Sequence, residues 1–253
     1  MITFHCSAAA AAHLDGNRRG SDSIFEPSGD GGCLSEQALG DILRWVVHAV
    51  KIGRSTCLIA MEVETRWVHV IHQVRLGDIR GFVERLCTRF INGMEWAETD
   101  LAVLTRSEME NAVDHYLGRH SELRFYRGTD RSVMGHIAQV SSEYQYVWRN
   151  VGAFPEDEET GLAFDLRLND TLLSRSGSNE YWNPTEAMMT HWLRGYAGKR
   201  DADVMAACKA LREARRGLTV ASEYRRSGEP HAGEPAGIDN VVDLRLARKR
   251  RLH

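Results

Sequence analysis

The stretch from Leu123 to Ile137 constrains the fold of this chain more than any other. Its start, residues 123–126, has the length and composition of a short β-strand. A polar turn follows, and from Asp130 to about Trp148 apolar residues recur at the spacing of a long helix. A strand that turns directly into a helix indicates a fold in which helices pack on a sheet.

The rest of the chain adds further strands and helices. Residues 1–6 alternate between apolar and polar side chains and predict a first strand. Residues 39–50 carry apolar side chains at helical spacing and predict a helix. Residues 56–63 and 67–74 predict two strands joined by a tight turn, and residues 101–105 predict a short strand. Helix starts are predicted at Asp78, at Ser107 with Glu110 as its capping-box partner, at Pro155, at Asn183-Pro184 and at Asp201.

The predicted helices gather in the second half of the chain instead of alternating with strands. This arrangement favours an α+β fold, with a small, mostly antiparallel sheet and several helices packed on it. We expect a single domain over residues 1–216, with a mobile insertion rich in small polar residues at 15–32. A flexible linker at 217–240 and a basic amphipathic tail at 241–253 are expected to follow.

Composition limits the class of protein. The chain has 253 residues, enough for a sizeable core, and no apolar run reaches the ~18 residues of a membrane-spanning helix, so we expect no membrane contact. The five cysteines are scattered and form no CxxC pair, which predicts neither disulfides nor a zinc site and favours a reducing cytoplasm. We expect neither a metal nor another cofactor.

The formal net charge of −3 is spread unevenly along the chain. It is −8 up to Tyr196 and +5 beyond it, and such an asymmetry indicates a tail with a partner of its own. A basic segment almost free of acids suits a polyanion, while the alternative is a solubilising, frayed end. The candidate nucleic-acid-binding residues are Arg245, Arg248, Lys249, Arg250 and Arg251.

Several short motifs resemble those of an uncharacterised bacterial family, a domain of unknown function. The motifs are the strand MITFHCS at residues 1–7, the element Arg131-Ser132-Val133-Met134-Gly135, the pair Leu168-Asn169, and an aromatic residue with Pro-x-Glu over residues 181–186. The resemblance covers about residues 1–196. The family has no established activity, so the resemblance implies one compact domain with an extension and nothing about catalysis.

The turn between the predicted strand and the long helix is a candidate anion site. Free backbone N–H groups at a helix start, with two guanidinium groups nearby, suit a phosphate or a carboxylate. Alternatively, Asp130 caps the helix, Gly128 makes the turn, and the arginines pair with acids at residues 156–159. The candidate anion-binding residues are Arg127, Thr129, Arg131 and Ser132.

No residue is assigned a catalytic or metal-binding role from the sequence. His69 and His72 are three apart in a predicted strand, which places them on opposite faces, so they cannot chelate one ion together. Ser132 lacks the context of a nucleophile elbow. Glu62 and Glu64 share a strand face, as a general acid and base do, but a solvated hairpin face explains them equally well.

Aromatic residues are frequent between residues 144 and 196, where arginines are interspersed. Exposed aromatic and arginine side chains are typical of protein interfaces, while the alternative is a helical core with ordinary amphipathic aromatics. The candidate partner-surface residues are Tyr146, Trp148, Tyr181 and Trp182.

These features favour a non-catalytic binding protein of a bacterium or a mobile element. Its globular domain would contact a protein or nucleoprotein, and its basic tail would contact nucleic acid. The alternative is an enzyme that acts on a phosphorylated small molecule or on nucleic acid through the turn at Arg127 and Arg131. A self-assembling structural protein is a third reading, and the oligomeric state stays open.

Overall fold

The computed structural model describes residues 1–16, 23–26, 42–101, 103–155, 157–174 and 181–227. The chain divides into two compact units, residues 1–209 (unit 1) and residues 210–253 (unit 2). Unit 1 contains both sheets, the described helices that precede the last one, and the beginning of that last helix. The described part of unit 2 is the remainder of that last helix.

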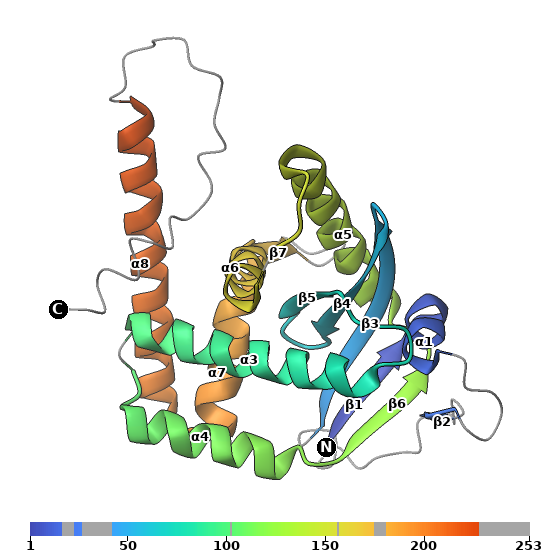
Figure 1. The fold of residues 1–253 in the computed structure, drawn as a ribbon. Helices are drawn as coiled ribbons and strands as arrows, with labels where there is room; N and C mark the ends of the chain where they lie inside the picture. The colour runs from blue at the N-terminus through green and yellow to red at the C-terminus, as the bar shows by residue number, and fades with distance from the viewer. Residues whose placement is uncertain (17–22, 27–41, 102, 156, 175–180, 228–253) are drawn as a thin grey trace. The chain divides into compact units, whose positions relative to one another are not determined.

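A six-stranded mixed sheet forms the centre of unit 1 (Figure 1). Its strands are β1 Ile2–Cys6, β2 Phe25–Glu26, β3 Leu43–Ile52, β4 Ser55–Glu62, β5 Val68–His72 and β6 Leu123–Arg127. In the order β2-β6-β1-β3-β4-β5, the first three neighbouring pairs are parallel and the last two are antiparallel. A separate two-stranded sheet joins β7 (Leu173–Ser174) to β8 (Tyr181–Trp182).

Helices cover both faces of the large sheet. They are α1 Ala8–Asp15, α3 Ile79–Leu101, α4 Arg106–Arg119, α5 Arg131–Val151, α6 Glu158–Asn169, α7 Pro184–Gly195 and α8 Asp201–Ser227. Buried side chains of α1, α3, α4 and α7 share one core with one sheet face. Those of α5 share a second core with the other face of β3, β4 and β5. The fold is therefore α/β, and no described helix has the length and apolarity to cross a membrane.

The expectation of a mostly antiparallel sheet was wrong, since β6 pairs in parallel with β1 and β2, and β1 pairs in parallel with β3, a strand that was predicted as a helix. Residues 43–50 of the predicted helix at 39–50 belong to β3. Trp45 and Val47 on this strand pack into the core with α1 and α3, while Val46 packs on the α5 side. A strand buried on both faces is apolar almost throughout, so it also satisfies helical spacing. As a strand, it gives β1 a parallel neighbour.

Other boundaries also differ from the prediction. Among residues 101–105, the described ones (101 and 103–105) do not form a strand, and α3 runs to Leu101. The capping box of α4 joins Thr105 to Glu108, two residues before the predicted pair. Within residues 15–32, the described part includes the end of α1 and all of β2, so it is not wholly an insertion.

The region after the core was predicted as a linker from residue 217. The helix α8 continues to Ser227, so residues 217–227 are helical. The remainder of the predicted linker and the tail at 241–253 lie outside the part of the chain that the structure describes.

Three predicted helix starts are confirmed by their capping hydrogen bonds. The backbone N–H of Gly81 donates to Asp78 Oδ1 over 2.9 Å at the start of α3. Asp130 accepts from the first turn of α5, and Asn183 accepts from Glu186 N at the start of α7, with Pro184 in the first turn. The first strand and the β4–β5 hairpin are also present as predicted.

The sheet edge at β5 is closed by side chains of α6. Asn169 Oδ1 accepts from the N–H of Val68 over 2.7 Å, and its Nδ2 donates to the Val68 carbonyl over 2.9 Å. Asp165 Oδ1 accepts from the N–H of Val70 over 3.0 Å. The two side chains therefore bond to the backbone of β5 as a neighbouring strand would, which protects this edge from another chain.

A buried ionic network supports this edge. Trp67 Nε1 donates to His69 Nε2 over 2.9 Å, and since an indole N–H only donates, the imidazole proton lies on Nδ1. Nδ1 then donates to Asp165 Oδ2 over 2.8 Å. Arg89, with 2% of its side chain exposed, pairs with the same oxygen at 3.2 Å and with Glu158 at 2.7 Å. The guanidinium compensates the charge of a carboxylate that is fully buried.

We expect Asn169→Ala to lower the free energy of unfolding by about 2–4 kcal/mol, because it leaves both backbone groups of Val68 buried without a partner. Urea titration followed by circular dichroism measures the change. Asn150→Ala, at the exposed end of α5, is the matched control and should change stability by less than about 0.5 kcal/mol. Equal effects of the two substitutions would contradict the closing of the β5 edge by Asn169.

A second buried carboxyl group lies on α3. Glu98 is 3% exposed, and burial raises its pKa to about 7, although a backbone hydrogen bond from Leu104 and the charge of Lys199 act in the opposite direction. The folded protein therefore holds this proton more tightly than the unfolded chain, whose carboxyl has a pKa of 4.5. Its contribution to stability is complete below pH 4.5 and is lost as the pH rises through 7.

Glu98→Gln should raise the free energy of unfolding at pH 8 by about 1–3 kcal/mol and flatten its decline between pH 5 and pH 8, because the amide never ionises. Denaturant titrations across this pH range provide the measurement. Glu95→Gln, at an exposed position on the same helix, serves as the control and should leave the profile unchanged. If the free energy of unfolding of the wild type did not decline between pH 5 and pH 8, ionisation of Glu98 would not destabilise the fold.

Candidate functional site

The carboxyl ends of β1 and β6 form the best-defined candidate site of unit 1. The chain leaves β1 into α1 on one sheet face, and it leaves β6 into α5 on the other face. In open α/β sheets, a crevice forms where neighbouring parallel strands connect to opposite faces, and ligands bind there. A hydrogen bond of 2.9 Å from Gly128 N–H to the Cys6 carbonyl joins the two strand ends. The predicted anion-binding turn lies at this edge.

The N-terminal end of α5 is occupied by the carboxylate of Asp130. Its Oδ1 accepts from Ser132 N over 2.7 Å, from Ser132 Oγ over 2.6 Å and from Val133 N over 3.2 Å. The hydrogen bond from the Ser132 hydroxyl, together with those from the two N–H groups, lowers the pKa of Asp130, so the group stays negative at neutral pH. These backbone donors of the helix thus already bind a carboxylate of the chain itself.

The four predicted anion-binding residues do not converge on one point. Arg127 pairs with Asp15 at 3.1 Å and lies over the ring of Phe25, with its guanidinium carbon 4.9 Å from the ring centre. Ser132 Oγ instead accepts from Arg66 Nη2 over 3.0 Å. The other two residues of the set, Thr129 and Arg131, are exposed. Their joint role in anion binding stays a prediction.

Arg66 is a residue that the sequence did not single out. It has a φ of 65°, an unusual backbone conformation for a side chain of this size, and only 7% of it is exposed. The turn that holds it is built by Glu62, whose Oε2 accepts from Thr65 N and Thr65 Oγ1, each over 2.7 Å. Glu62 is therefore buried in the turn, while Glu64 is exposed and pairs with Arg44.

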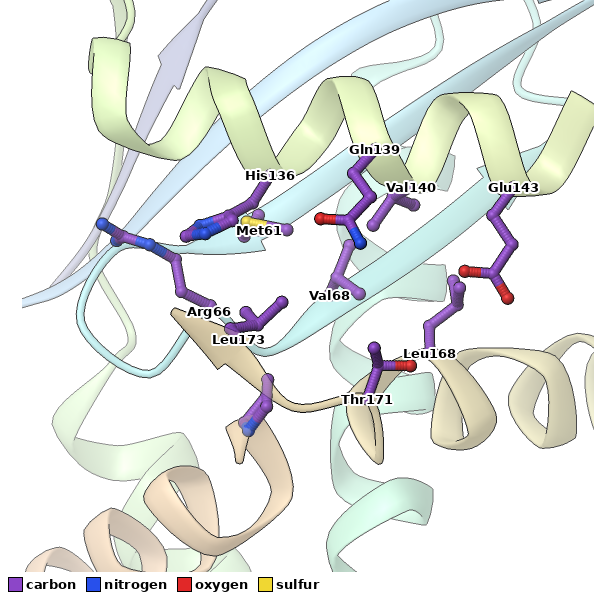
Figure 2. Close-up of a pocket in the computed structure, with 11 residues that line it drawn as sticks. Met61, Arg66, Val68, His136, Gln139, Val140, Glu143, Leu168, Thr171 and Leu173 are labelled. Atoms are coloured by element: carbon purple, nitrogen blue, oxygen red, sulfur yellow. The ribbon is translucent and has the colours of Figure 1, made fainter. Parts of the chain in front are cut away.

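A small hollow lies next to Arg66, between α5 and the hairpin of β4 and β5. Figure 2 shows the side chains that line it, with a mostly apolar floor and polar groups above and beside it. Its volume of about 20 Å³ has room for roughly one water molecule. The floor contains Met61, Val68 and Leu168, and above and beside it lie Arg66, His136, Gln139 and Glu143.

Three of the motifs that carry the family resemblance meet around this hollow. Ser132 bonds to Arg66, while Leu168 and Pro184 line the hollow itself. The hydroxyl of Thr185 donates to the Asn169 carbonyl over 3.0 Å, which joins the motif at residues 181–186 to the Leu168-Asn169 motif. Segments far apart in the sequence therefore lie together around this hollow, beside the hairpin of β4 and β5.

The predicted partner-surface residues fall into two classes. Tyr146 on α5 and Tyr181 on β8 are 68% and 70% exposed. Trp148 instead packs on Phe154, with ring centres 6.1 Å apart, and Trp182 packs on His136 at 5.9 Å. The two tyrosines are exposed, whereas the two tryptophans make ring contacts within the protein.

Metal chemistry finds no support among the described residues, where no three His, Cys, Asp or Glu side chains are grouped to hold an ion. His69 stacks on Trp45 in one core, and His72 stacks on Phe154 in the other, as alternation along a strand requires. The five basic tail residues predicted to contact nucleic acid lie outside the described residues.

Asp130→Gly should lower stability by only about a few tenths of a kcal/mol and make the protein sensitive to phosphate, because it frees the N–H groups at the start of α5. Thermal unfolding with and without 20 mM sodium phosphate, at matched ionic strength, gives the readout. We expect an upward shift of Tm with phosphate in the variant and none in the wild type. A phosphate-dependent shift in the wild type would instead support the anion site at this turn.

Comparisons with known proteins place the chain in a family without assigning it an activity. No curated protein matches it, and no solved structure does. One family model, described as a domain of unknown function, matches residues 3–187 and so includes the sheet, the turn at Arg66 and the start of α7. This span agrees with the resemblance that the sequence motifs carry, and the chain belongs to the family of the domain of unknown function DUF6933.

Proposed function

We propose that this protein works by binding, with unit 1 contacting a protein or nucleoprotein and the basic segment of unit 2 contacting nucleic acid. The observation that carries the proposal is that the charge changes sign at the boundary between the units. Residues 1–209 contain 22 Lys and Arg against 29 Asp and Glu, a net charge of −7. Residues 210–253 contain 10 against 6, a net charge of +4.

The opposite net charges of the two units favour a different kind of binding partner for each unit. An acidic unit repels the phosphate backbone of nucleic acid, while a basic segment releases counterions when it binds there. Five of the ten basic residues of unit 2 fall in residues 241–253, where Asp243 is the one acidic residue. The density of positive charge is therefore highest at this segment.

Exposed tyrosines support the protein-binding role of unit 1. Tyr181 on β8 is 70% exposed, and Leu172, which directly precedes its partner strand β7, is 63% exposed. Tyr146 on α5 is 68% exposed. Tyrosine supplies a large contact area with few rotatable bonds and a hydroxyl for hydrogen bonding, which is why it is frequent at the centres of protein interfaces.

Replacing the five basic residues at 245, 248, 249, 250 and 251 by glutamine in the full chain should abolish most nucleic-acid binding, because up to five phosphate contacts are lost. Fluorescence anisotropy with a labelled duplex at 50 and 200 mM salt measures affinity and salt dependence. For the wild type we expect log K to fall with log salt at a slope of up to about −4.

The matched control replaces the four arginines among these five residues by lysine. This keeps the charge and should keep both the affinity and the salt slope within a factor of a few. In the glutamine variant we expect a loss of at least about 100-fold at 50 mM salt and a slope near zero. Binding that is equal in the wild type and the glutamine variant would remove the tail from the proposal.

A further inference from the structure

Ser7 and His48 form a hydrogen-bonded pair at the carboxyl end of β1, at the sheet edge described above. Ser7 directly follows β1 and is the N-cap of α1, and its Oγ lies 2.9 Å from Nδ1 of His48 on the neighbouring strand β3. Both side chains are partly exposed, so a molecule from solvent can reach them. Neither residue was singled out by the sequence, because residue 48 was assigned to a helix and strand pairing alone brings the two together.

Ser7 Oγ accepts from the N–H of Ala10 over 3.2 Å, and its hydroxyl proton can be donated at the same time. Partial burial lowers the pKa of His48, so its imidazole is neutral at pH 7 and one ring nitrogen accepts. In the tautomer with the proton on Nε2, Nδ1 accepts from the Ser7 hydroxyl, which is the arrangement of a serine nucleophile and its general base.

The start of α1 supplies the other requirement of acyl transfer, a place for negative charge. The first N–H groups of a helix have no partner within it, and the residue after Ser7 is the first helical residue. In enzymes with a serine between a strand and a helix, the N–H of that following residue stabilises the oxyanion. Here Ala8 and Ala9 are small and exposed, so they leave the approach to Ser7 open.

Charges of both signs act at this end of β1. Besides burial, the charge of Arg44 lowers the pKa of His5 and that of Asp130 raises it, and the charge of Arg127 acts on the neighbouring Cys6. An uncharged ester is repelled by neither sign of charge.

We propose that Ser7 is a nucleophile and His48 its general base for acyl transfer from uncharged carboxylic esters. Ser7 Oγ forms a bond to the carbonyl carbon while its proton passes to His48 Nδ1. The bond from that carbon to the alcohol oxygen then breaks, and His48 returns the proton to the leaving alcohol. Water attacks the acyl-serine in the same way, which releases the carboxylic acid and restores Ser7. This activity goes beyond the binding role and does not depend on the tail.

The test is covalent labelling of the full chain with an alkyl fluorophosphonate, followed by peptide mass spectrometry, together with release of p-nitrophenol from p-nitrophenyl acetate. We expect a single adduct at Ser7. Ser7→Gly should abolish it, and a glycine N-cap keeps α1 within a few tenths of a kcal/mol. His48→Gln should slow labelling at least about 100-fold. The wild-type rate should also fall as the pH is lowered through the pKa of His48, since a protonated imidazole cannot accept the hydroxyl proton.

Ser142→Ala is the matched control, because Ser142 on α5 is exposed and donates to the Ala138 carbonyl over 3.0 Å, away from the carboxyl end of β1. It should be labelled at Ser7 like the wild type. Circular dichroism verifies that each variant is folded. No adduct at Ser7 in the folded wild type, or labelling that is unchanged in His48→Gln, would overturn the proposal. The glutamine tail variant should be labelled normally, which separates this activity from nucleic-acid binding.

Discussion

The ion pair between Arg89 and Asp165 is the interaction on which the arrangement of unit 1 depends most. Asp165 has no exposed surface, so its charge is tolerated only because the guanidinium and the imidazole of His69 meet it. Gly161 permits the approach, since a Cβ at that position would overlap the Arg89 guanidinium. This contact joins α3 to α6 and fixes α6 along β5. The hollow at Arg66 and the start of α7 are built on the position that α6 then takes.

The sequence predicted those parts of the fold that interactions between neighbouring residues determine. Asp78, Asp130 and Asn183 were recognised because an N-cap acts on the first turn of its own helix. The strand β3 was missed because its neighbours on both faces, and not its own pattern, make it a strand. One parallel pair, β1 with β3, was lost with that strand, whereas the parallel pairs of β6 with β1 and β2 join segments far apart in the sequence.

The candidate site was less predictable than the fold because its contacts join distant segments. The turn at Asp130 was located correctly, but the partner of Arg127 is Asp15, whose approach depends on α1 and β2. Arg66 carries no sequence signal, since its positive φ follows from the hairpin geometry. The pair of Ser7 and His48 required the register of β1 against β3. Spacing along the chain cannot reveal any of these contacts.

The position of β1 in the sheet also determines when the fold can form. The strands β3, β4 and β5 pair through short turns, so they can assemble from neighbouring residues. By contrast, the pairing of β1 with β6 joins Ile2 to Leu123, and contacts of such long range form slowly. During synthesis on the ribosome, β1 must wait for more than 100 residues before its second neighbour exists, and the edge of β5 stays open until Asn169 has been made. The nascent chain is thus exposed to strand pairing with other chains for most of its synthesis, and chaperone demand should be greatest in that interval.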